Sequence, residues 1–161
     1  PIDVPNGAKV TYARQPILRP QPWDGMLVNG GGRPINLAEP SQTIPASAGG
    51  NRTHILDPDG VLVDYHRHLM AGAEPRSGEV PGVRRLTVKE SARIQAFPDS
   101  HVFLGHQSSR YSQVGNAVPP RLAEVIGQAL KSQLDDDEEW RVAGNPVRSH
   151  QLTLLSDVLV S

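Results

Sequence analysis

The chain has 161 residues, with 15 glycines, 15 prolines, no cysteine and a net charge of −1. The absence of cysteine excludes disulfides, thiolate metal sites and a cysteine nucleophile within these residues. No apolar run approaches the ~20 residues that span a bilayer, and residues 1–4 lack the features of a signal peptide. We therefore expect a cytoplasmic protein with a modest core and no membrane partner.

Residues 1–83 are predicted to form a loop-rich, mostly β module. Glycine, proline, asparagine and aspartate punctuate this region throughout, which is typical of turns. Between the turns lie short β-prone segments at residues 9–12, 26–28, 43–44, 53–56 and 60–65. Residues 57–60 separate two of these segments and favour a hairpin connection. The only helical pattern predicted here is a short one over residues 65–70.

Residues 84–134 are predicted to contain two helices. Thr87 and Glu90 have the spacing of a capping box, which predicts a helix over residues 88–96 that ends before Phe97-Pro98. A loop is expected to follow as far as residue 117. Its last part contains a Gly-Asn turn that we expect to feed the next helix. Such a place can offer free backbone N–H groups to an anion, although the turn taken alone favours a plain loop-to-helix junction.

The second helix is predicted to open at Pro119-Pro120, since proline is tolerated in a first turn. It carries an amphipathic apolar stripe at Leu122, Val125, Ile126, Ala129 and Leu130. The acidic run at residues 135–139 opposes the negative end of the helix dipole, so the helix is expected to stop near Leu134. The apolar patch at residues 152–160 is open to three interpretations, namely an added strand, a partner contact or disorder.

Charge and histidine content leave two further alternatives. Six basic residues against two acidic ones lie between Arg84 and Arg121, which suits either a phosphate-facing patch or, as we favour, ordinary surface arginines. His66 and His68 would share one face of a strand, and His54 lies upstream. Without cysteine or a third ligand at fixed spacing, satisfied histidines are favoured over a zinc site.

Two stretches carry a family resemblance. Residues 85–98 read RLTVKESARIQAFP, and residues 113–120 read QVGNAVPP, with 16 residues between Pro98 and Gly115. Together they resemble the last two sequence blocks of the DNA cytosine-5 methyltransferases, although Lys89 stands where arginine is more usual. Residues 32–37 and 39–44 resemble, more weakly, a segment of the target-recognition domain in many of these enzymes.

This resemblance implies a function that the chain cannot perform alone. Enzymes of this family flip a cytosine out of double-stranded DNA, add a cysteine thiolate to C6 and methylate C5 from S-adenosyl-L-methionine. The chain has no cysteine and no Gly-rich cofactor loop. The resemblance therefore implies the C-terminal portion of such an enzyme, as a fragment or a split subunit, which needs an N-terminal methyltransferase half. Restriction-modification is the setting implied. Two alternatives are a non-catalytic DNA-binding module and a protein-interaction module that docks through the stripe at residues 122–130.

The implied fold is α+β, a loop-rich, mostly β recognition module followed by two helices that pack on a Rossmann-like domain absent from this chain. The implied regions are target recognition (1–83), the connecting motif and pocket-closing helix (84–134) and the tail (135–161). The residues that match the cofactor-lining block are Gly115, Asn116, Ala117 and Val118. Those that match the block ordering the recognition domain are Arg85, Thr87, Glu90, Arg93 and Gln95, of which Glu90 and Arg93 are expected to form ion pairs or hydrogen bonds. The DNA-contact candidates are Ser41, Gln42, Thr43, Asn51 and Arg52.

Overall fold

The computed structural model describes residues 5–47 and 49–142, and side chains as far as residue 134. The chain divides into two units, residues 1–120 and residues 121–161. The predicted apolar patch at 152–160 lies outside the described residues. Among the residues described, no helix has the length and apolar character needed to cross a membrane.

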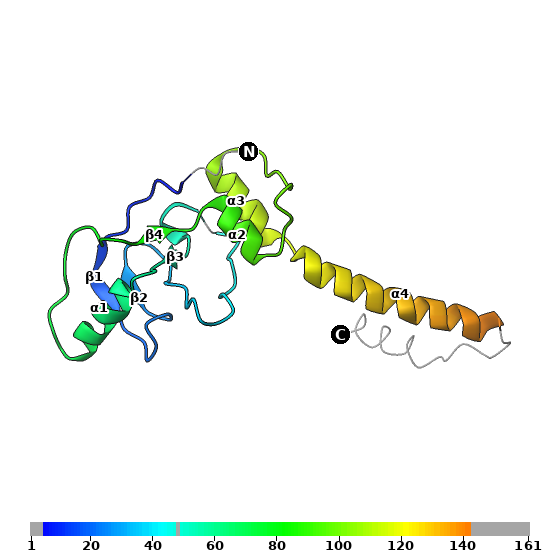
Figure 1. Cartoon of the computed structure of the whole chain (residues 1–161), viewed down its shortest axis with the longest axis horizontal. Helices are drawn as coiled ribbons and strands as arrows, with labels where there is room; N and C mark the ends of the chain where they lie inside the picture. Colours follow the sequence, from blue (N-terminus) through cyan, green and yellow to red (C-terminus); the bar gives the residue numbers. More distant parts are fainter. Residues whose placement is uncertain (1–4, 48, 143–161) are drawn as a thin grey trace, which may run out of the picture. The chain divides into compact units, whose positions relative to one another are not determined.

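The first core forms where a small sheet meets a helix. Strand β1 (Tyr12–Ile17) pairs antiparallel with β2 (Met26–Val28), and helix α1 (Val61–Met70) lies beside them (Figure 1). The strand predicted at 26–28 is confirmed, whereas the one predicted at 9–12 begins only at Tyr12. The buried residues of this core are Val10, Leu27, Val28, Ile55, Leu62, Tyr65, Leu69 and Val80.

Helix α1 corrects two predictions, because residues 57–60 are not a hairpin and residues 60–65 are not a strand. The Asp57 carboxylate accepts hydrogen bonds from the backbone N–H groups of Val61 (2.9 Å) and Leu62 (2.8 Å). It thereby satisfies donors that a helix start leaves free. Leu62 and Tyr65 are fully buried on one face, so helical burial overrides the β preference of this sequence. The ten-residue helix α1 therefore stands beside the short strands β1, β2 and β3 in residues 1–83, a helix longer than the sequence predicted.

A second two-stranded sheet separates the two cores. Strand β3 (Ile55–Leu56) pairs antiparallel with β4 (Arg84–Arg85). Successive side chains of a strand point to opposite faces. Accordingly, Ile55 is buried in the first core while Leu56 packs against the second. The predicted strand at 53–56 is thus confirmed in its second half, and a single 3-10 turn (Gly50–Arg52) precedes it. The strand predicted at residues 43–44 is not present.

The second core lies around helices α2 (Val88–Ile94) and α3 (Gln107–Asn116). The capping box predicted for α2 is present, but the helix ends at Ile94, because Ala96 adopts a left-handed φ of 59°. Helix α3 occupies a segment predicted as loop. The buried residues of this core are Ile35, Ile44, Leu86, Ala92, Tyr111 and Val114. The described part of the chain is therefore α+β, as predicted.

Helix α4 (Pro120–Val142) begins at Pro120 as predicted but does not stop near Leu134. An unfavourable charge in the last turns of a helix costs only a few tenths of a kcal/mol to about 1 kcal/mol. No glycine or proline occurs between Gly127 and Gly144 to break the helix more strongly. The large apolar side chains of the helix are about half exposed or more, at Leu122, Val125, Ile126, Leu130 and Leu134.

Candidate functional site

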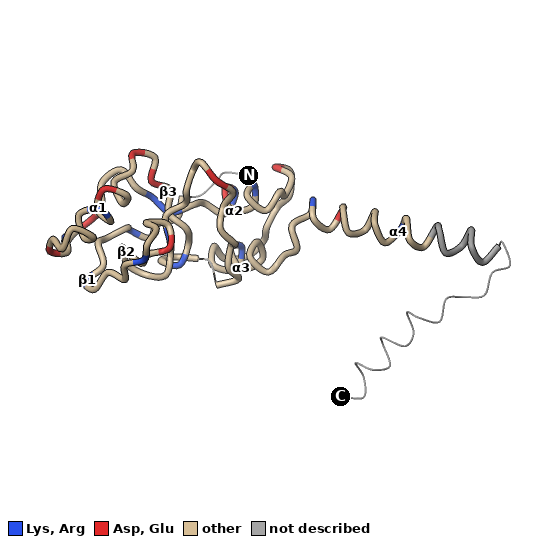
Figure 2. The backbone as a smooth tube through the Cα atoms, turned by 90° about the horizontal axis from the view of Figure 1, so that it is seen from below, with Lys and Arg blue, Asp and Glu red and all other residues tan. Residues whose placement is uncertain are grey.

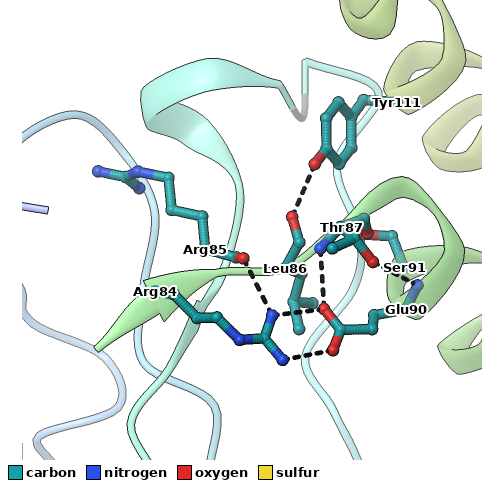
Figure 3. Close-up of polar contacts among 7 residues, drawn as sticks. All are labelled: Arg84, Arg85, Leu86, Thr87, Glu90, Ser91 and Tyr111. Carbon is teal, nitrogen blue, oxygen red and sulfur yellow. Dashed lines mark hydrogen bonds and ion pairs between the residues drawn. The ribbon is translucent and has the colours of Figure 1, made fainter. Parts of the chain in front are cut away.

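Arg84 and the first residues of the motif block, which spans residues 85–98, form one hydrogen-bonded cluster at the start of α2 (Figure 3). The Arg84 guanidinium donates two short bonds to the Glu90 carboxylate, 2.6 and 2.7 Å long. That carboxylate also accepts from the backbone N–H of Thr87 at 2.9 Å, and the Thr87 hydroxyl accepts from the N–H of Glu90 at 3.1 Å. Two of the free donors of the helix start are therefore satisfied within the block itself.

The same contacts set the protonation of Glu90. The hydrogen bonds from Arg84 lower the pKa of Glu90 to about 2, with help from Thr87 and against an opposing effect of burial. Bonds to the charged form of a carboxylate favour ionisation. Glu90 is therefore a carboxylate throughout the ordinary pH range and acts as a structural anion at the helix start.

Arg85, the neighbour of Arg84 in β4, points the opposite way and is buried, with 2 % of its surface exposed. Its guanidinium donates to the Thr53 carbonyl oxygen (3.0 Å) and to the backbone and side-chain oxygens of Asn29 (2.8 and 2.9 Å). Burial lowers the pKa of Arg85 from its ordinary value. Because all three acceptors lie 32 or 56 residues away in sequence, Arg85 connects the motif block to two separate loops of residues 1–83.

The glycines at 30–32 make room for this connection. A Cβ on Gly32 would overlap the Thr53 carbonyl oxygen and lie 2.6 Å from a guanidinium nitrogen of Arg85. Gly30 has a φ of 78°, and its Cβ would overlap the backbone of Asn51. Gly30 and Gly32 are therefore required for the close approach of this backbone to Asn51, Thr53 and Arg85.

The rest of the block contacts α3 and the turn after α2. Arg93 donates two bonds to Asp99, 2.7 and 2.8 Å long, and Arg93 lowers the pKa of that carboxyl. The Gln95 amide donates to the Val114 carbonyl oxygen at 3.4 Å. The Tyr111 hydroxyl of α3 donates to the Leu86 carbonyl oxygen at 2.7 Å. The block thus holds α2, α3 and the turn after α2 together.

Four of the six basic residues between Arg84 and Arg121 are paired with a carboxylate or buried. Arg84 pairs with Glu90, Arg93 with Asp99, and Arg121 with Glu124. Arg85 is buried. Basic and acidic positions are interspersed along the backbone of residues 5–120 (Figure 2). For these four residues the structure agrees with the interpretation as ordinary arginines rather than as a phosphate-facing patch.

Residues 115–118 lie elsewhere than expected. Gly115 and Asn116 form the last turn of α3, so they do not provide the free N–H groups of a helix start. A Cβ on Gly115 would overlap the Pro45 carbonyl oxygen and lie 2.6 Å from its carbon. Asn116 is exposed and Val118 is 61 % exposed. The described residues offer the Asn116 amide no hydrogen-bond partner, which leaves it available to a ligand.

The DNA-contact candidates are only partly brought together. Gln42, Thr43 and Arg52 line one cavity of about 530 Å³, whereas Ser41 and Asn51 are not among its lining residues. The other lining residues, which sequence reasoning did not select for this site, are Asp24, Gly31, Arg33, Pro45, Ser47 and His54. In the sequence, His54 was a candidate only as a metal ligand. Its position close to Gln42, Thr43 and Arg52 in the chain was the one sign that it could belong to the same site.

The histidine pair at 66 and 68 lies on α1 rather than on a strand, so the two rings do not share a face. The ring of His66 lies 2.8 Å from the Arg19 carbonyl oxygen, and that of His68 lies 3.2 Å from the Glu74 carbonyl oxygen. Among the side chains described, which lie within residues 5–47 and 49–134, no group of three or more metal-ligating residues comes together.

A second cavity, of about 560 Å³, lies beside α2 and the loop that follows it. Its wall includes Phe97, His101 and Phe103, whose ring centroids lie 4.6 to 5.1 Å apart. Val102 and Leu104 also line it and are 53 % and 73 % exposed. Sequence reasoning missed this cavity because these residues were assigned to an ordinary loop.

Comparison with known proteins places this arrangement in a family. The family model of the C-5 cytosine-specific DNA methylases matches residues 32–132, which is more than half of the chain. This range includes the DNA-contact candidates at residues 41–52, the motif block and residues 115–118, but not β1 and β2. The weaker resemblance at residues 32–44 and the stronger one downstream therefore lie within a single match.

Individual relatives align over about a third of the chain. The chain is 49 % identical over 53 residues to the type II methyltransferase M.AplI of Arthrospira platensis, and 52 % over 52 residues to M.Eco47II of Escherichia coli. It is 50 % identical over 52 residues to DNA (cytosine-5)-methyltransferase 1A of Oryza sativa. These segments are 33 %, 32 % and 32 % of this chain but only 15 %, 12 % and 3 % of the relatives. The chain belongs to the C-5 cytosine-specific DNA methylase family.

Proposed function

We propose that the chain is the C-terminal portion of a DNA (cytosine-5)-methyltransferase. In this proposal, the loops of residues 1–83 recognise double-stranded DNA, and residues 84–134 connect them to the cofactor pocket of the catalytic domain. The family match over residues 32–132 supports the proposal, as does the small share of each relative that the chain covers.

One contact carries the proposal. Gly115 lies so close to the carbonyl group of Pro45 that no side chain fits between them. Pro45 lines the cavity that contains Gln42 and Arg52, two of the DNA-contact candidates. A displacement of the DNA-facing loop would therefore move the turn that precedes Asn116. This contact gives a physical route by which bound DNA and the cofactor pocket influence each other.

S-adenosyl-L-methionine, when bound, supplies the methyl group that is transferred to C5 of cytosine. Asn116 and Val118 suit one wall of its site, because both side chains are exposed and the amide of Asn116 can donate and accept hydrogen bonds. Gly115 fixes the position of this wall through Pro45. The apolar residues of α4 suit packing against the catalytic domain, since they are half exposed or more in this chain.

The chain alone is expected to be inactive, because the thiolate that adds to C6 has no counterpart in a sequence without cysteine. The test is to mix the chain with a methyltransferase half that carries the cysteine nucleophile and the Gly-rich cofactor loop, and to measure methyl transfer to cytosine in duplex DNA. We expect no transfer by the chain alone and transfer by the mixture. Activity of the chain alone would overturn the proposal.

A matched pair of variants makes the test specific to the cofactor wall. Asn116→Ala should raise the KM for S-adenosyl-L-methionine in the mixture, because it removes the free amide. Ser108→Ala changes an equally exposed position in the first turn of the same helix and should leave this KM unchanged. Equal KM values for both variants would exclude Asn116 from the site. An inactive mixture that still binds DNA would favour a non-catalytic DNA-binding module instead.

A further inference from the structure

The cavity of about 560 Å³ beside α2 has an apolar wall that belongs to the folded core. Three of its lining residues, Val88, Phe97 and Phe103, also pack against the second core, and a fourth, Ala92, is buried in that core. The rings of Phe97 and Phe103 meet edge to face, with their centroids 5.1 Å apart. This part of the cavity is therefore formed by the fold itself and is present without a ligand.

The loop that joins α2 to α3 (Figure 1) adds two exposed apolar side chains to the cavity. Val102 is 53 % exposed and Leu104 is 73 % exposed. The backbone beside them is nevertheless held by α3, because Gln113 donates to the Leu104 carbonyl oxygen at 2.8 Å and Arg110 donates to that of Gly105 at 2.8 Å. The loop thus presents these side chains in a fixed position, which reduces the entropy that a partner would lose on binding them.

Positive charge accompanies this apolar surface. Lys89, Arg93 and Arg110 line the cavity, and Asp99 is its single acidic lining residue. Arg93 donates two hydrogen bonds to Asp99, so these two charges balance each other. The bonds from Arg93 are the largest influence that lowers the pKa of Asp99, and the charge of Lys89 adds to them, so Lys89 lies near this pair. Among the described residues, no carboxylate lies within ion-pair distance of Lys89 or Arg110, which leaves two positive charges unpaired.

These features define the chemistry of an occupant. Apolar groups would remove Val102 and Leu104 from water, which is favourable in proportion to the apolar area buried. Carboxylates would complement the unpaired charges of Lys89 and Arg110. An exposed apolar patch with a polar rim is typical of a protein interaction site. An acidic protein segment with large apolar side chains supplies both the apolar groups and the carboxylates.

Nucleic acid fits this cavity less well. Proteins bind single strands by stacking bases on aromatic faces. Here Phe97 and Phe103 are half-buried and pack against each other and against the ring of His101, which leaves them poorly placed as stacking platforms. A phosphate backbone, moreover, carries no apolar group that would cover Leu104.

We propose that the cavity beside α2 binds an acidic segment of a partner protein. The segment places large apolar side chains against Val102 and Leu104 and carboxylates beside Lys89 and Arg110. All lining residues of this site lie between residues 88 and 110, so the site includes neither the DNA-contact candidates nor residues 115–118. The inference therefore goes beyond the proposed function and does not rest on it.

The first test selects peptides that bind the full chain from a randomised peptide library. We expect the enriched peptides to combine leucine, phenylalanine or tryptophan with aspartate or glutamate. Their affinity should fall as salt is added, because ion pairs near the surface are screened. Enrichment of basic or uncharged peptides, or of no peptide, would overturn the proposal.

Variants of the chain then show where a selected peptide binds. Leu104→Ser should weaken its binding by about 10- to 100-fold, because a leucine side chain is no longer buried. Leu37→Ser is the matched control, since Leu37 is 61 % exposed but does not line the cavity. Lys89→Gln should weaken binding by about 2- to 5-fold, whereas Lys131→Gln, at an exposed lysine of α4, should have no effect. Equal affinities for each variant and its control would place the peptide elsewhere and overturn the proposal.

A further measurement uses the unaltered chain and so does not depend on how the variants fold. The leucine methyl groups are isotope-labelled, and a selected peptide is added while their NMR signals are recorded. The signal of Leu104 should move, and that of Leu37 should stay in place. If the signal of Leu104 stays in place while the peptide binds, the proposal is wrong.

Competition separates this inference from the proposed function. Duplex DNA, and in a second experiment the methyltransferase half, is added to the complex of chain and peptide, and neither should release the peptide. Release by DNA would assign the cavity to nucleic acid, and release by the methyltransferase half would assign it to an interface within the proposed enzyme. Either result overturns a separate protein partner. Absence of methyl transfer in the mixture, with peptide binding retained, would count against the proposed function alone.

Discussion

Replacement of Arg85 by methionine tests whether the motif block holds the recognition loops together. Methionine fills much of the same volume but donates no hydrogen bonds, so the oxygens of Thr53 and Asn29 that accept from the guanidinium lose their donor. Each buried acceptor left unsatisfied costs about 1–3 kcal/mol. Removal of the desolvation cost of a buried guanidinium offsets part of this loss. We expect a net decrease in the free energy of unfolding of about 2–4 kcal/mol.

The measurement is urea unfolding of the full chain, followed by circular dichroism. The free energies of unfolding of the variants are compared with the same dependence on urea concentration for each. Arg84→Met is the matched control, because the adjacent arginine is 52 % exposed and pairs with Glu90 near the surface. The control should cost no more than about 1 kcal/mol. If Arg85→Met costs less than its control, Arg85 does not connect the loops to the motif block, and the reasoning from its burial is wrong.

Three further predictions concern the same unit. The pKa of Glu90 is about 2 in the folded chain, below the ordinary value of 4.5. Its contribution to the free energy of unfolding is therefore complete above about pH 5 and is lost as pH falls from 4.5 towards 2. Near the surface this contribution is about 1–2 kcal/mol, and Glu90→Gln should abolish that part of the pH dependence of urea unfolding. Gly115→Ala should destabilise the fold by about 2–3 kcal/mol through overlap with the Pro45 carbonyl group, whereas Gly127→Ala, with open space around it, should not lower the midpoint. Thr87→Ala should cost about 1 kcal/mol by removal of the helix cap, and an unchanged midpoint would contradict the role of its hydroxyl.

The helices illustrate what could be predicted from local sequence. The start of α2 was predictable because Thr87 and Glu90 lie three residues apart and satisfy each other's backbone groups. Helix α3 was not predicted. Only Tyr111 and Val114 of its residues are buried, and two apolar positions among polar residues are too few to show a helical periodicity. Residues 61–65 of α1 were predicted as part of a strand. Burial of one face selects the helix instead, and the residues that cover this face lie far away in the chain.

The candidate site likewise divides into features that the sequence predicted and contacts that only the folded chain shows. Matching residues were sufficient to predict the family. Three of the predicted DNA-contact candidates, Gln42, Thr43 and Arg52, line one cavity, and their contact with DNA stays a prediction. Matching residues did not predict that Gly115 packs against Pro45, or that His54 lines the same cavity as Gln42. Such contacts join positions that no motif relates, so spacing along the chain gives no signal for them.

The sequence by itself determined that the chain belongs to the C-5 cytosine-specific DNA methylase family and that its 161 residues contain no cysteine, since both facts depend only on residue identity and order. Only the tertiary structure decided which of two adjacent arginines is buried and which hydrogen-bonding atoms remain unused. Arg85 finds its partner Asn29 56 residues away, while Arg84 pairs locally with Glu90. Burial and hydrogen bonding depend on neighbours in space, and the chain brings those neighbours together only when it folds.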